Sequence, residues 1–306
     1  MTKLLQTLMD GVAVGSLYAL IALGYTMVYG ILRFINFAHG DVFMLGAWIS
    51  YALAVALGFG TEAAPLWAAP VVLIGCMAIC GTLGFTIERL AYRPLRDAPR
   101  INVLITAIGV SLFLENAGQL EKVFGTRPQR MPSLLPDITL FTVVDVHVHL
   151  VDALVIGLSL LLMGGLQYLI YGTKFGRAMR AVSFDTRTAA LMGIPVDRVI
   201  SVTFVVGSAL AAAAGFLSAA KYPSLNQPAH TTWILLGLKA FVAAVVGGIG
   251  NVRGAMAGGV LIGLVEMFGA AYLTPDLRDV YVFSLLILVL LFMPEGLLGK
   301  ATVEKV

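Results

Sequence analysis

Nine apolar runs, most of them about twenty residues long, restrict the fold of this chain more than any other feature. Five contain no charged residue: Gly11–Leu32, Val42–Thr61, Leu66–Ile87, Ala153–Thr173 and Val199–Ala220. Four more contain a charged side chain: Ile101–Leu120 with Glu115, Trp233–Val252 with Lys239, Gly254–Leu273 with Glu266, and Val280–Leu298 with Glu295. Because a helix needs roughly 20 mostly apolar residues to cross a bilayer, the sequence predicts an all-α polytopic membrane helix bundle. We expect eight or nine membrane segments, with one of them re-entrant as an alternative.

The scarcity of charged side chains supports a membrane location. Hydrophobic residues make up 59% of the chain and charged residues 12%, whereas soluble domains carry about 25% charged residues. We therefore expect a single transmembrane domain over residues 1–306. No long basic run is present, so nucleic acid is not an expected partner. Cys76 and Cys80 lie in one apolar run with no histidine near them, and we expect no metal site.

Basic residues predict which loops face the cytoplasm. The loops around Arg33, at 89–100 and 174–198, around Arg253 and in the C-terminal tail hold 13 of the 20 Lys and Arg residues. Short loops rich in Lys and Arg face the cytoplasm, so we expect these loops inside the cell. The N-terminus is then outside if all nine runs cross, or inside if the segment near residues 31–45 is re-entrant. Loop 121–152 is expected on the extracytoplasmic side, where the alternation over Val143–His149 predicts a strand or hairpin.

The segment 173–195 is too polar to span and lies within the expected cytoplasmic loops. Four apolar residues recur there at helical spacing: Phe175, Ala178, Met179 and Val182. Asp185 and Thr186 are expected to cap a second short helix that ends at Leu191, and Gly193 and Pro195 then stop it. Two short helices between spans offer an apolar ridge to a partner protein. A surface helix whose arginines rest on anionic headgroups is the alternative.

Polar residues interrupt the apolar pattern at Phe34–Ala47. Asn36, His39 and Asp41 lie there, and Gly40 and Gly46 are expected to weaken a regular helix. Polar groups and unwound backbone at membrane depth are tolerated where they line a cavity. A polar cytoplasmic turn between two spans is the alternative. His39 and Asp41 are two residues apart and would not share a helix face, so the sequence does not favour a membrane-embedded enzyme.

A second group of polar and small residues lies between Lys239 and Glu266. Both charged residues fall inside apolar runs, so Lys239 must find a partner or extend to the membrane interface. Dense glycine, including Gly247 and Gly248, predicts a helix break or very close helix packing. Asn36 and Gly40 in one half, with Asn251 and Gly254 in the other, suggest an internal repeat around a central site. Glu115 is expected as an interfacial group.

Several motifs together resemble those of the branched-chain amino acid ABC-importer permeases of the LivH type. They occur in that family's order and cover nearly the whole chain: Gly11–Ala47, ERLAYRPLRDAP at Glu88–Pro99, GRAMRAVSFDTRTAALMGIP at Gly176–Pro195, Phe241–Glu266 and PEGLLG at Pro294–Gly299. A nucleotide-binding motif is absent from the sequence. Gly299-Lys300 lacks the glycine spacing of a phosphate loop, and Ala301 stands where Ser or Thr is required.

The resemblance implies that residues 173–195 form the cytoplasmic coupling loop that docks on an ATPase subunit. The positions that match the family's loop are Gly176, Arg177, Arg180, Ala181, Asp185, Ala190 and Gly193. It also implies a transport subunit of the bacterial inner membrane rather than an enzyme. The implied partners are a second homologous permease chain, two ATPase subunits, an extracytoplasmic substrate-binding protein and membrane lipid. ATP and Mg²⁺ would then be bound by the ATPase subunits, and this chain would hold no cofactor.

The implied cargo is leucine, isoleucine or valine. Urea and short amides are the alternative cargo, because the permeases of such relatives are poorly separated by sequence. A secondary transporter or channel without ATPase coupling is the other alternative. We expect alternating access through a translocation pathway that is lined by two groups of residues: Asn36, His39, Gly40 and Asp41, and Lys239, Gly247, Gly248, Asn251 and Glu266.

Overall fold

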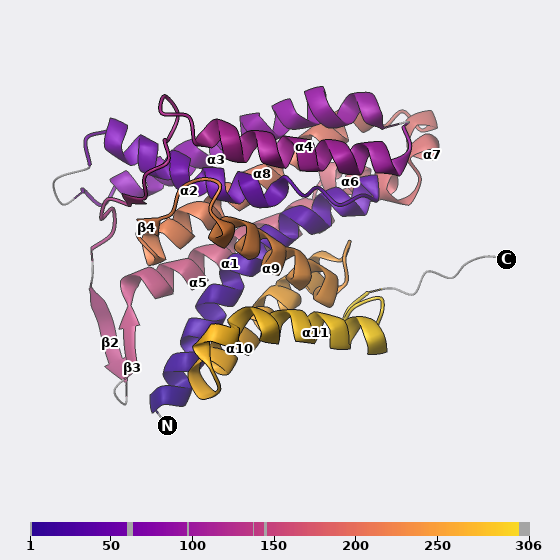
Figure 1. The fold of residues 1–306 in the computed structure, drawn as a ribbon. Coiled ribbons are helices and arrows are strands. Elements are labelled where there is room, and N and C mark those ends of the chain that lie inside the picture. Colours follow the sequence, from indigo (N-terminus) through magenta and orange to yellow (C-terminus); the bar gives the residue numbers. More distant parts are fainter. Residues whose placement is uncertain (1, 60–63, 97, 137, 144–145, 300–306) are drawn as a thin grey trace.

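A computed structural model of the protein describes residues 2–59, 64–96, 98–136, 138–143 and 146–299. The end of the second apolar run at Thr61, and Lys300 and Ala301, lie outside the described residues. The long helices are α1 (Thr2–Leu32), α2 (His39–Ala56), α3 (Ala68–Ile87), α4 (Arg100–Gly118), α5 (Leu150–Gly172), α8 (Val196–Lys221), α9 (Thr231–Gly247), α10 (Val252–Tyr272) and α11 (Arg278–Phe292). They form one helical bundle, and α1 crosses it diagonally (Figure 1).

Each of the nine predicted apolar runs is helical over most of its length. Within the described residues, seven of these helices are long and apolar enough to cross a membrane. The other two are shorter, with 17 residues in α9 and 15 in α11. At 1.5 Å per residue they measure about 25 Å and about 22 Å, slightly less than the roughly 30 Å of a bilayer core. The prediction of a polytopic all-α membrane bundle is therefore confirmed.

The core of the bundle is built around α1, which is buried along most of its length and packs against α5, α8, α9 and α10. Glycine permits the closest of these contacts. A side chain at Gly263 of α10 would overlap the backbone of Gly15 on α1, and one at Gly259 would overlap Ala19. Small residues bring membrane helices together because close backbone approach increases the packing between them. The abundance of glycine in the sequence thus reflects helix packing.

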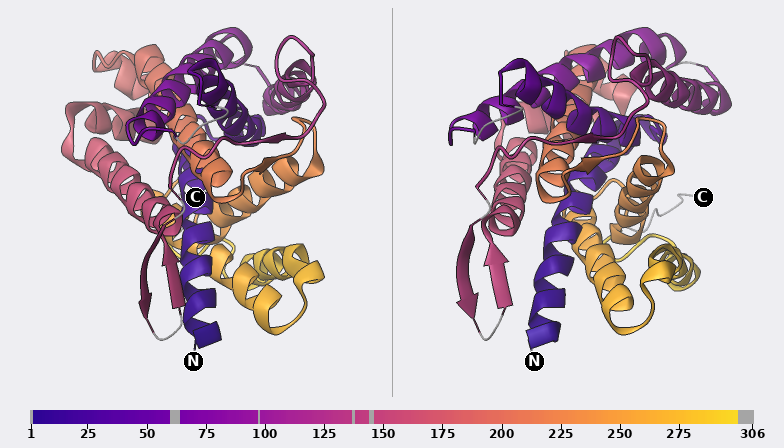
Figure 2. Two further views of the ribbon diagram at one scale, coloured as in Figure 1. Left: turned by 90° about the vertical axis from the view of Figure 1, so that its left-hand side faces the viewer. Right: turned by 60° about the vertical axis from the view of Figure 1, so that its left-hand side comes forward.

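The molecule has two ends, one with a β-hairpin and one with two short helices (Figures 1 and 2). At the hairpin end, strands β2 (Thr139–Val143) and β3 (Val146–His149) pair antiparallel, which confirms the strand or hairpin predicted there. The N-terminus lies at this end. Strands β1 (Gln129–Arg130) and β4 (Ser224–Leu225) also pair, and they hold the loop after α4 against the end of α8. Lys221 adds an ion pair with Asp152.

The opposite end, which we call the elbow end, carries the short helices α6 (Lys174–Phe184) and α7 (Thr186–Leu191). Loops that the sequence assigns to the cytoplasm meet here. Arg33 lies beside Ser183 and Arg253, and Arg89 and Arg93 lie beside Arg198. The N-terminus lies at the other end of the bundle, opposite these loops, so it is outside if these loops face the cytoplasm as expected.

Two expectations about helix regularity are wrong. Gly40 and Gly46 do not weaken the helix, because α2 runs through both without interruption and only residues 33–38 before it are irregular. The last apolar run is not one helix either. It leaves α11 at Phe292, and the backbone N–H groups of Leu297 and Leu298 then donate to the carbonyls at the end of α9.

Candidate functional site

Local capping shapes the two short helices of the elbow, which we define as Lys174–Leu191. The hydroxyl of Thr173 accepts a hydrogen bond from the Gly176 N–H at 3.0 Å and so begins α6. Asp185 caps α7 by accepting from the N–H groups of Arg187 at 2.8 Å and Thr188 at 3.1 Å. These bonds satisfy backbone donors that would otherwise lack a partner at a helix start. The two predicted helices and the predicted cap are confirmed.

The inner side of the elbow is attached to the ends of two long helices. Gly176 packs so closely on α5 that a side chain there would overlap the Ile170 carbonyl, and Arg180 donates to that same carbonyl. Ser183 donates to the Gly30 carbonyl of α1. The elbow is therefore in direct contact with the ends of α1 and α5.

The outer side of the elbow presents large apolar side chains to solvent. Phe184 is 93% exposed and Leu191 is 87% exposed, and Met192, the residue directly after the elbow, is 78% exposed. The predicted apolar ridge of Phe175, Ala178, Met179 and Val182 packs against the bundle instead, so the expectation that it faces a partner is wrong. Exposed apolar side chains gathered at one place mark a surface for a protein partner. Of the predicted coupling residues, Arg177, Asp185 and Ala190 are exposed, Ala181 is half-buried, and Gly193 ends α7 with a positive φ of 78°.

The predicted break before α2 lies inside the bundle. Asn36 is 5% exposed, and its side-chain oxygen accepts a hydrogen bond from the Tyr92 hydroxyl at 2.6 Å. His39 is 2% exposed and lies edge-on to Tyr25, with ring centroids 4.8 Å apart. The ring of His39 also fills the space left by the absent side chain of Gly24. The alternative of a solvated turn does not fit this burial.

Gly40 and Asp41 line an inner cavity of about 120 Å³. Asp41 lies beside Ser111 and Glu115 of α4 in that cavity. Asp41 and His39 therefore face different helices, as their spacing predicts. Glu115 is 8% exposed and lies near the end of α4, so it is buried among the helices, and its position at the membrane interface stays a prediction. The charge within the fourth apolar run was the sequence signal that pointed to it. The remaining lining comes mainly from aromatic and small residues: Tyr25, Phe37, Gly237 and Phe241.

Lys239 and Glu266 form the centre of a buried ion network. The Lys239 ammonium lies 2.8 Å from a Glu266 oxygen and 2.6 Å from an Asp279 oxygen. The Tyr18 hydroxyl donates to the second Glu266 oxygen at 2.7 Å. Lys239 therefore pairs within the bundle and does not extend to the interface. The sequence placed Lys239 and Glu266 together but identified neither Tyr18 nor Asp279.

Glu266 also lines an outer cavity of about 200 Å³ toward the hairpin end. Its wall combines the Glu266 carboxylate and the Arg278 guanidinium with apolar side chains, which include Leu17, Ile21, Phe43, Leu236 and Met267. Phe43 lies one turn beyond Gly40 on α2, so the two cavities follow each other along that helix.

The remaining predicted pathway residues lie apart from both cavities. Gly248 has a positive φ of 102° and ends α9. Asn251 begins α10 by accepting from the Arg253 N–H at 3.1 Å, and its amide donates to the Leu298 carbonyl at 2.6 Å. Gly247 accepts from Leu298 N–H. The helix break predicted from glycine is confirmed at this turn. Asn36 is buried, whereas Asn251 forms a cap at the elbow end, so the internal repeat stays a prediction.

Comparison with known proteins identifies the family. Over residues 7–291 the chain matches the family described as branched-chain amino acid transport system, permease component. The chain belongs to this family. It is 43% identical to the high-affinity branched-chain amino acid transport system permease protein BraD of Pseudomonas aeruginosa, over 99% of this chain and 98% of the relative. It is 44% identical to LivH of Salmonella typhimurium and 43% identical to LivH of Escherichia coli, over 99% of this chain and 97% of each relative.

This permease is a multi-pass protein of the inner membrane and a transport subunit rather than an enzyme. No solved structure shows a significant match to the chain. As a component of a transport system, the permease works with other components. The resemblance inferred from the sequence motifs is thus confirmed over nearly the full length.

Proposed function

We propose that this permease moves branched-chain amino acids into the cell as the membrane subunit of an ATP-driven importer. The match to the permease family over residues 7–291 carries this proposal. Relatives that are 43% to 44% identical bear the name of high-affinity branched-chain amino acid permeases. The proposed partners are a second homologous permease, two ATPase subunits that bind ATP and Mg²⁺, and an extracytoplasmic binding protein.

The elbow is the proposed docking surface for an ATPase subunit. Phe184 and Leu191 would enter apolar pockets of that subunit, because truly exposed large apolar side chains are the usual anchors of an interface. Arg177 is exposed on the same short segment and adds a positive charge for an acidic partner surface. The attachment of the elbow to α1 and α5 provides the route by which docking affects the bundle.

The outer cavity suits an aliphatic amino acid. Such a molecule carries an ammonium group, a carboxylate and an apolar side chain. The Glu266 carboxylate, which also contacts Lys239 and Tyr18, attracts the ammonium. Arg278 supplies a guanidinium for the carboxylate, and the apolar wall accommodates the side chain. Urea carries no charge and no apolar part, so the cavity does not favour urea as the cargo.

The proposed transport cycle is alternating access. The binding protein delivers substrate at the hairpin end, and the outer cavity receives it. Closure of the ATPase pair displaces the elbow, and the bundle then opens toward the cytoplasm through the inner cavity and the region of Asp41 and Glu115. A bound nucleotide shifts this equilibrium only through its different affinity for the two states of the ATPase pair.

Uptake into proteoliposomes tests the proposal. The permease is reconstituted with its second permease, ATPase subunits and binding protein, and labelled leucine, isoleucine, valine and urea are offered with ATP or a non-hydrolysable analogue. We expect ATP-dependent uptake of the three amino acids and none of urea. Uptake of urea alone, or equal uptake of leucine without ATP, contradicts the proposal.

One substitution tests the outer cavity. Arg278→Gln removes the guanidinium, and we expect leucine uptake to fall by roughly tenfold or more, because a hydrogen bond to a charged group contributes about 1.5–3 kcal/mol. Arg127→Gln is the matched control, since Arg127 is exposed in the loop after α4. Equal leucine uptake by the two variants would show that the outer cavity is not part of the translocation pathway.

A further inference from the structure

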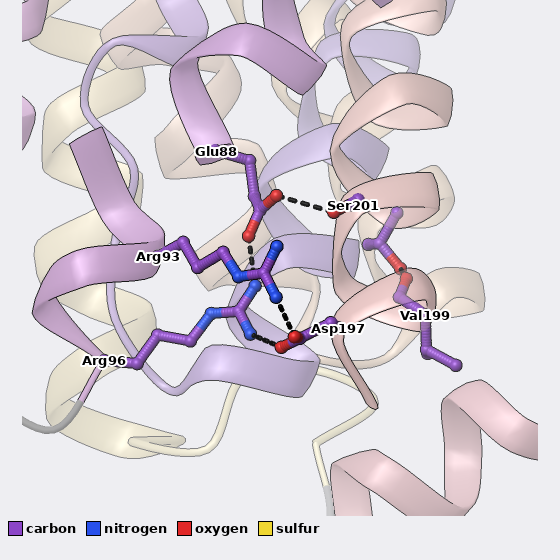
Figure 3. A network of polar contacts seen from close by, with 7 residues as sticks. Glu88, Arg93, Arg96, Asp197, Val199 and Ser201 are labelled. Carbon is purple, nitrogen blue, oxygen red and sulfur yellow. Dashed lines mark hydrogen bonds and ion pairs between the residues drawn. The ribbon is translucent and has the colours of Figure 1, made fainter. Parts of the chain in front are cut away.

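The end of α3 forms a polar link to the start of α8 (Figure 3). We call residues Glu88–Arg96 the bracket. It consists of a π-helical turn, Glu88–Tyr92, and a 3₁₀ turn, Arg93–Leu95. Arg93 donates to the Asp197 carboxylate, and Arg96 donates to the same carboxylate at 2.6 Å. Because Asp197 lies in the first turn of α8, two arginines hold the start of that helix.

A buried carboxylate fixes the bracket in place. The Glu88 side chain is only 1% exposed and accepts hydrogen bonds from Arg96 and, at 2.6 Å, from the Ser201 hydroxyl of α8. With Arg93 and Asp197, these residues form a set of two positive and two negative charges. A buried charge that loses its partner is strongly unfavourable, so the geometry of this set is restricted. The π-helical turn is a rare conformation that occurs frequently at functional sites.

The bracket reaches the break before α2 through Tyr92. The Tyr92 hydroxyl donates to Asn36 at 2.6 Å, and the ring packs on Phe34 and Phe204 with centroids 5.3 Å and 5.5 Å away. Tyr92 is 1% exposed. The next residue after Asn36 is Phe37, which lines the inner cavity. A shift of Tyr92 therefore moves a segment that forms part of the cavity wall.

Through Arg93 and Arg96, the bracket also binds Asp197, which lies close to the elbow in the sequence. Asp197 follows Pro195, the last residue of segment 173–195, after one intervening residue. We propose that the bracket transmits displacement of the elbow to the wall of the inner cavity, and that Tyr92, Glu88 and Asp197 are positioning residues for coupling. This inference rests on the proposed function. None of the three lines either cavity, so their effect on transport acts through Asn36 and the segment that carries it.

The fully assembled transporter in proteoliposomes provides the test. Leucine uptake and ATP hydrolysis are measured together, which gives the number of leucine molecules moved per ATP. The variants are Tyr92→Phe, Asp197→Asn and the double variant. Tyr168→Phe and Asp276→Asn are matched controls, since Tyr168 is 71% exposed on α5 and Asp276 is exposed at the hairpin end.

We expect each bracket variant to retain its ATPase subunits and to hydrolyse ATP, yet to move roughly tenfold less leucine per ATP. Allosteric coupling typically amounts to about 5- to 150-fold. The double variant is expected to move as much leucine per ATP as the more impaired single variant, because both changes interrupt the same connection. A purely structural role would lower protein yield and both activities together, and it would leave the ratio unchanged.

Two results overturn the proposal: an unchanged ratio in Tyr92→Phe, or effects of the two single variants that multiply in the double variant. If Tyr92→Phe does not fold, Ser201→Ala replaces it, because it removes only one hydrogen bond to Glu88 and retains a good helix former. We expect it to lower the ratio about threefold, and an unchanged ratio counts against the proposal. Absence of ATP-driven leucine uptake in the unmodified transporter refutes the proposed function itself.

Discussion

Replacement of Lys239 by methionine tests whether the buried ion network stabilises the bundle. Methionine has a similar length and no charge, so the variant removes the ammonium while retaining most of the packing. Glu266 is then left buried, with its side chain 7% exposed and with the Tyr18 hydroxyl as its remaining partner. Asp279 is 45% exposed, so water can solvate it after the change. The cost should therefore come mainly from Glu266.

The magnitude follows from this geometry. Breaking a buried ion pair by removing one partner destabilises a protein by about 3–5 kcal/mol. An exposed pair contributes only about 0–1 kcal/mol, so loss of the Asp279 contact adds little. At roughly 2–4 °C per kcal/mol for chains of 150–250 residues, we expect Lys239→Met to lower the apparent Tm by at least about 6 °C.

The two free cysteines provide the assay. Cys76 and Cys80 are both fully buried, so a thiol-reactive dye reports unfolding of the permease in lipid nanodiscs as the temperature rises. Lys122→Met is the control, because Lys122 is exposed in the loop after α4. The double variant Lys239→Met with Glu266→Gln should recover about half of the loss, since it removes the stranded carboxylate. A Tm equal to that of the control, or additive effects in the double variant, refutes the reasoning.

Three further outcomes follow from the structure. Gly237→Ala places a methyl group 2.9 Å from the backbone of α2 and should destabilise the bundle by about 1–3 kcal/mol in the same assay, whereas Gly109→Ala, with nothing within 4 Å, should not. Phe184→Asp should abolish co-purification of the ATPase subunits without lowering the Tm, and Val123→Asp should leave co-purification intact. The pKa of Asp185 is lowered, mainly by the Thr188 hydroxyl, relative to its value in the unfolded chain. The stabilising effect of this cap on α7 is therefore complete above the ordinary carboxyl pKa and is lost as pH falls through the lowered value. The protection factors of the α7 amides, which are corrected for the intrinsic pH dependence of exchange, should fall at acid pH, and they should fall less in Asp185→Asn.

The predictions from the sequence succeeded where the signal is local. An apolar run must become a helix in a membrane because its backbone groups have no other partner, and so each of the nine runs could be placed. The two short helices of the elbow could also be predicted from the sequence, because the cap at Asp185 and the stop at Gly193 depend on neighbours a few residues away. The same holds for the β2–β3 hairpin, whose alternating pattern is visible over a few residues.

Hydrogen bonds between residues far apart in the chain could not be predicted from the sequence. Tyr18 bonds to Glu266 across 248 positions, and Ser201 bonds to Glu88 across 113. Such pairs depend on the rotation of each helix about its axis and on the depth at which helices meet, and neither is encoded in one run of residues. A change in helix rotation of one residue, about 100°, would separate both pairs. The burial of Glu115 could not be predicted for the same reason, because it depends on whether α2 lies against α4.

Glycine illustrates the same limit at single positions. Gly40 and Gly248 both occur in predicted breaks, yet Gly40 lies inside a regular helix and Gly248 ends one. Gly40 is required by the approach of α9, since a side chain there would lie 3.2 Å from a backbone atom of Gly237. Gly248 is required by its positive φ of 102°. The sequence indicates that glycine is needed at these positions. Only the structure shows whether the reason is a close helix approach, as at Gly40, or a positive φ, as at Gly248.

The packing also indicates which helices can move during transport. The seam between α1 and α10 is closed by backbone contact at Gly15 and Gly263, and opening it would lose contacts that lipid cannot replace at such close range. In contrast, α3, α4 and α5 expose apolar side chains on their outer faces, for example Ile74, Leu112 and Leu161. These helices exchange one lipid contact for another when they shift, at little cost. The elbow is attached to α5 and to the end of α1, and the bracket continues α3, so these connections join the α1–α10 core to helices of the lipid-facing layer. If docking of an ATPase displaces the elbow as proposed, the closed α1–α10 seam should stay fixed and the lipid-facing layer should move.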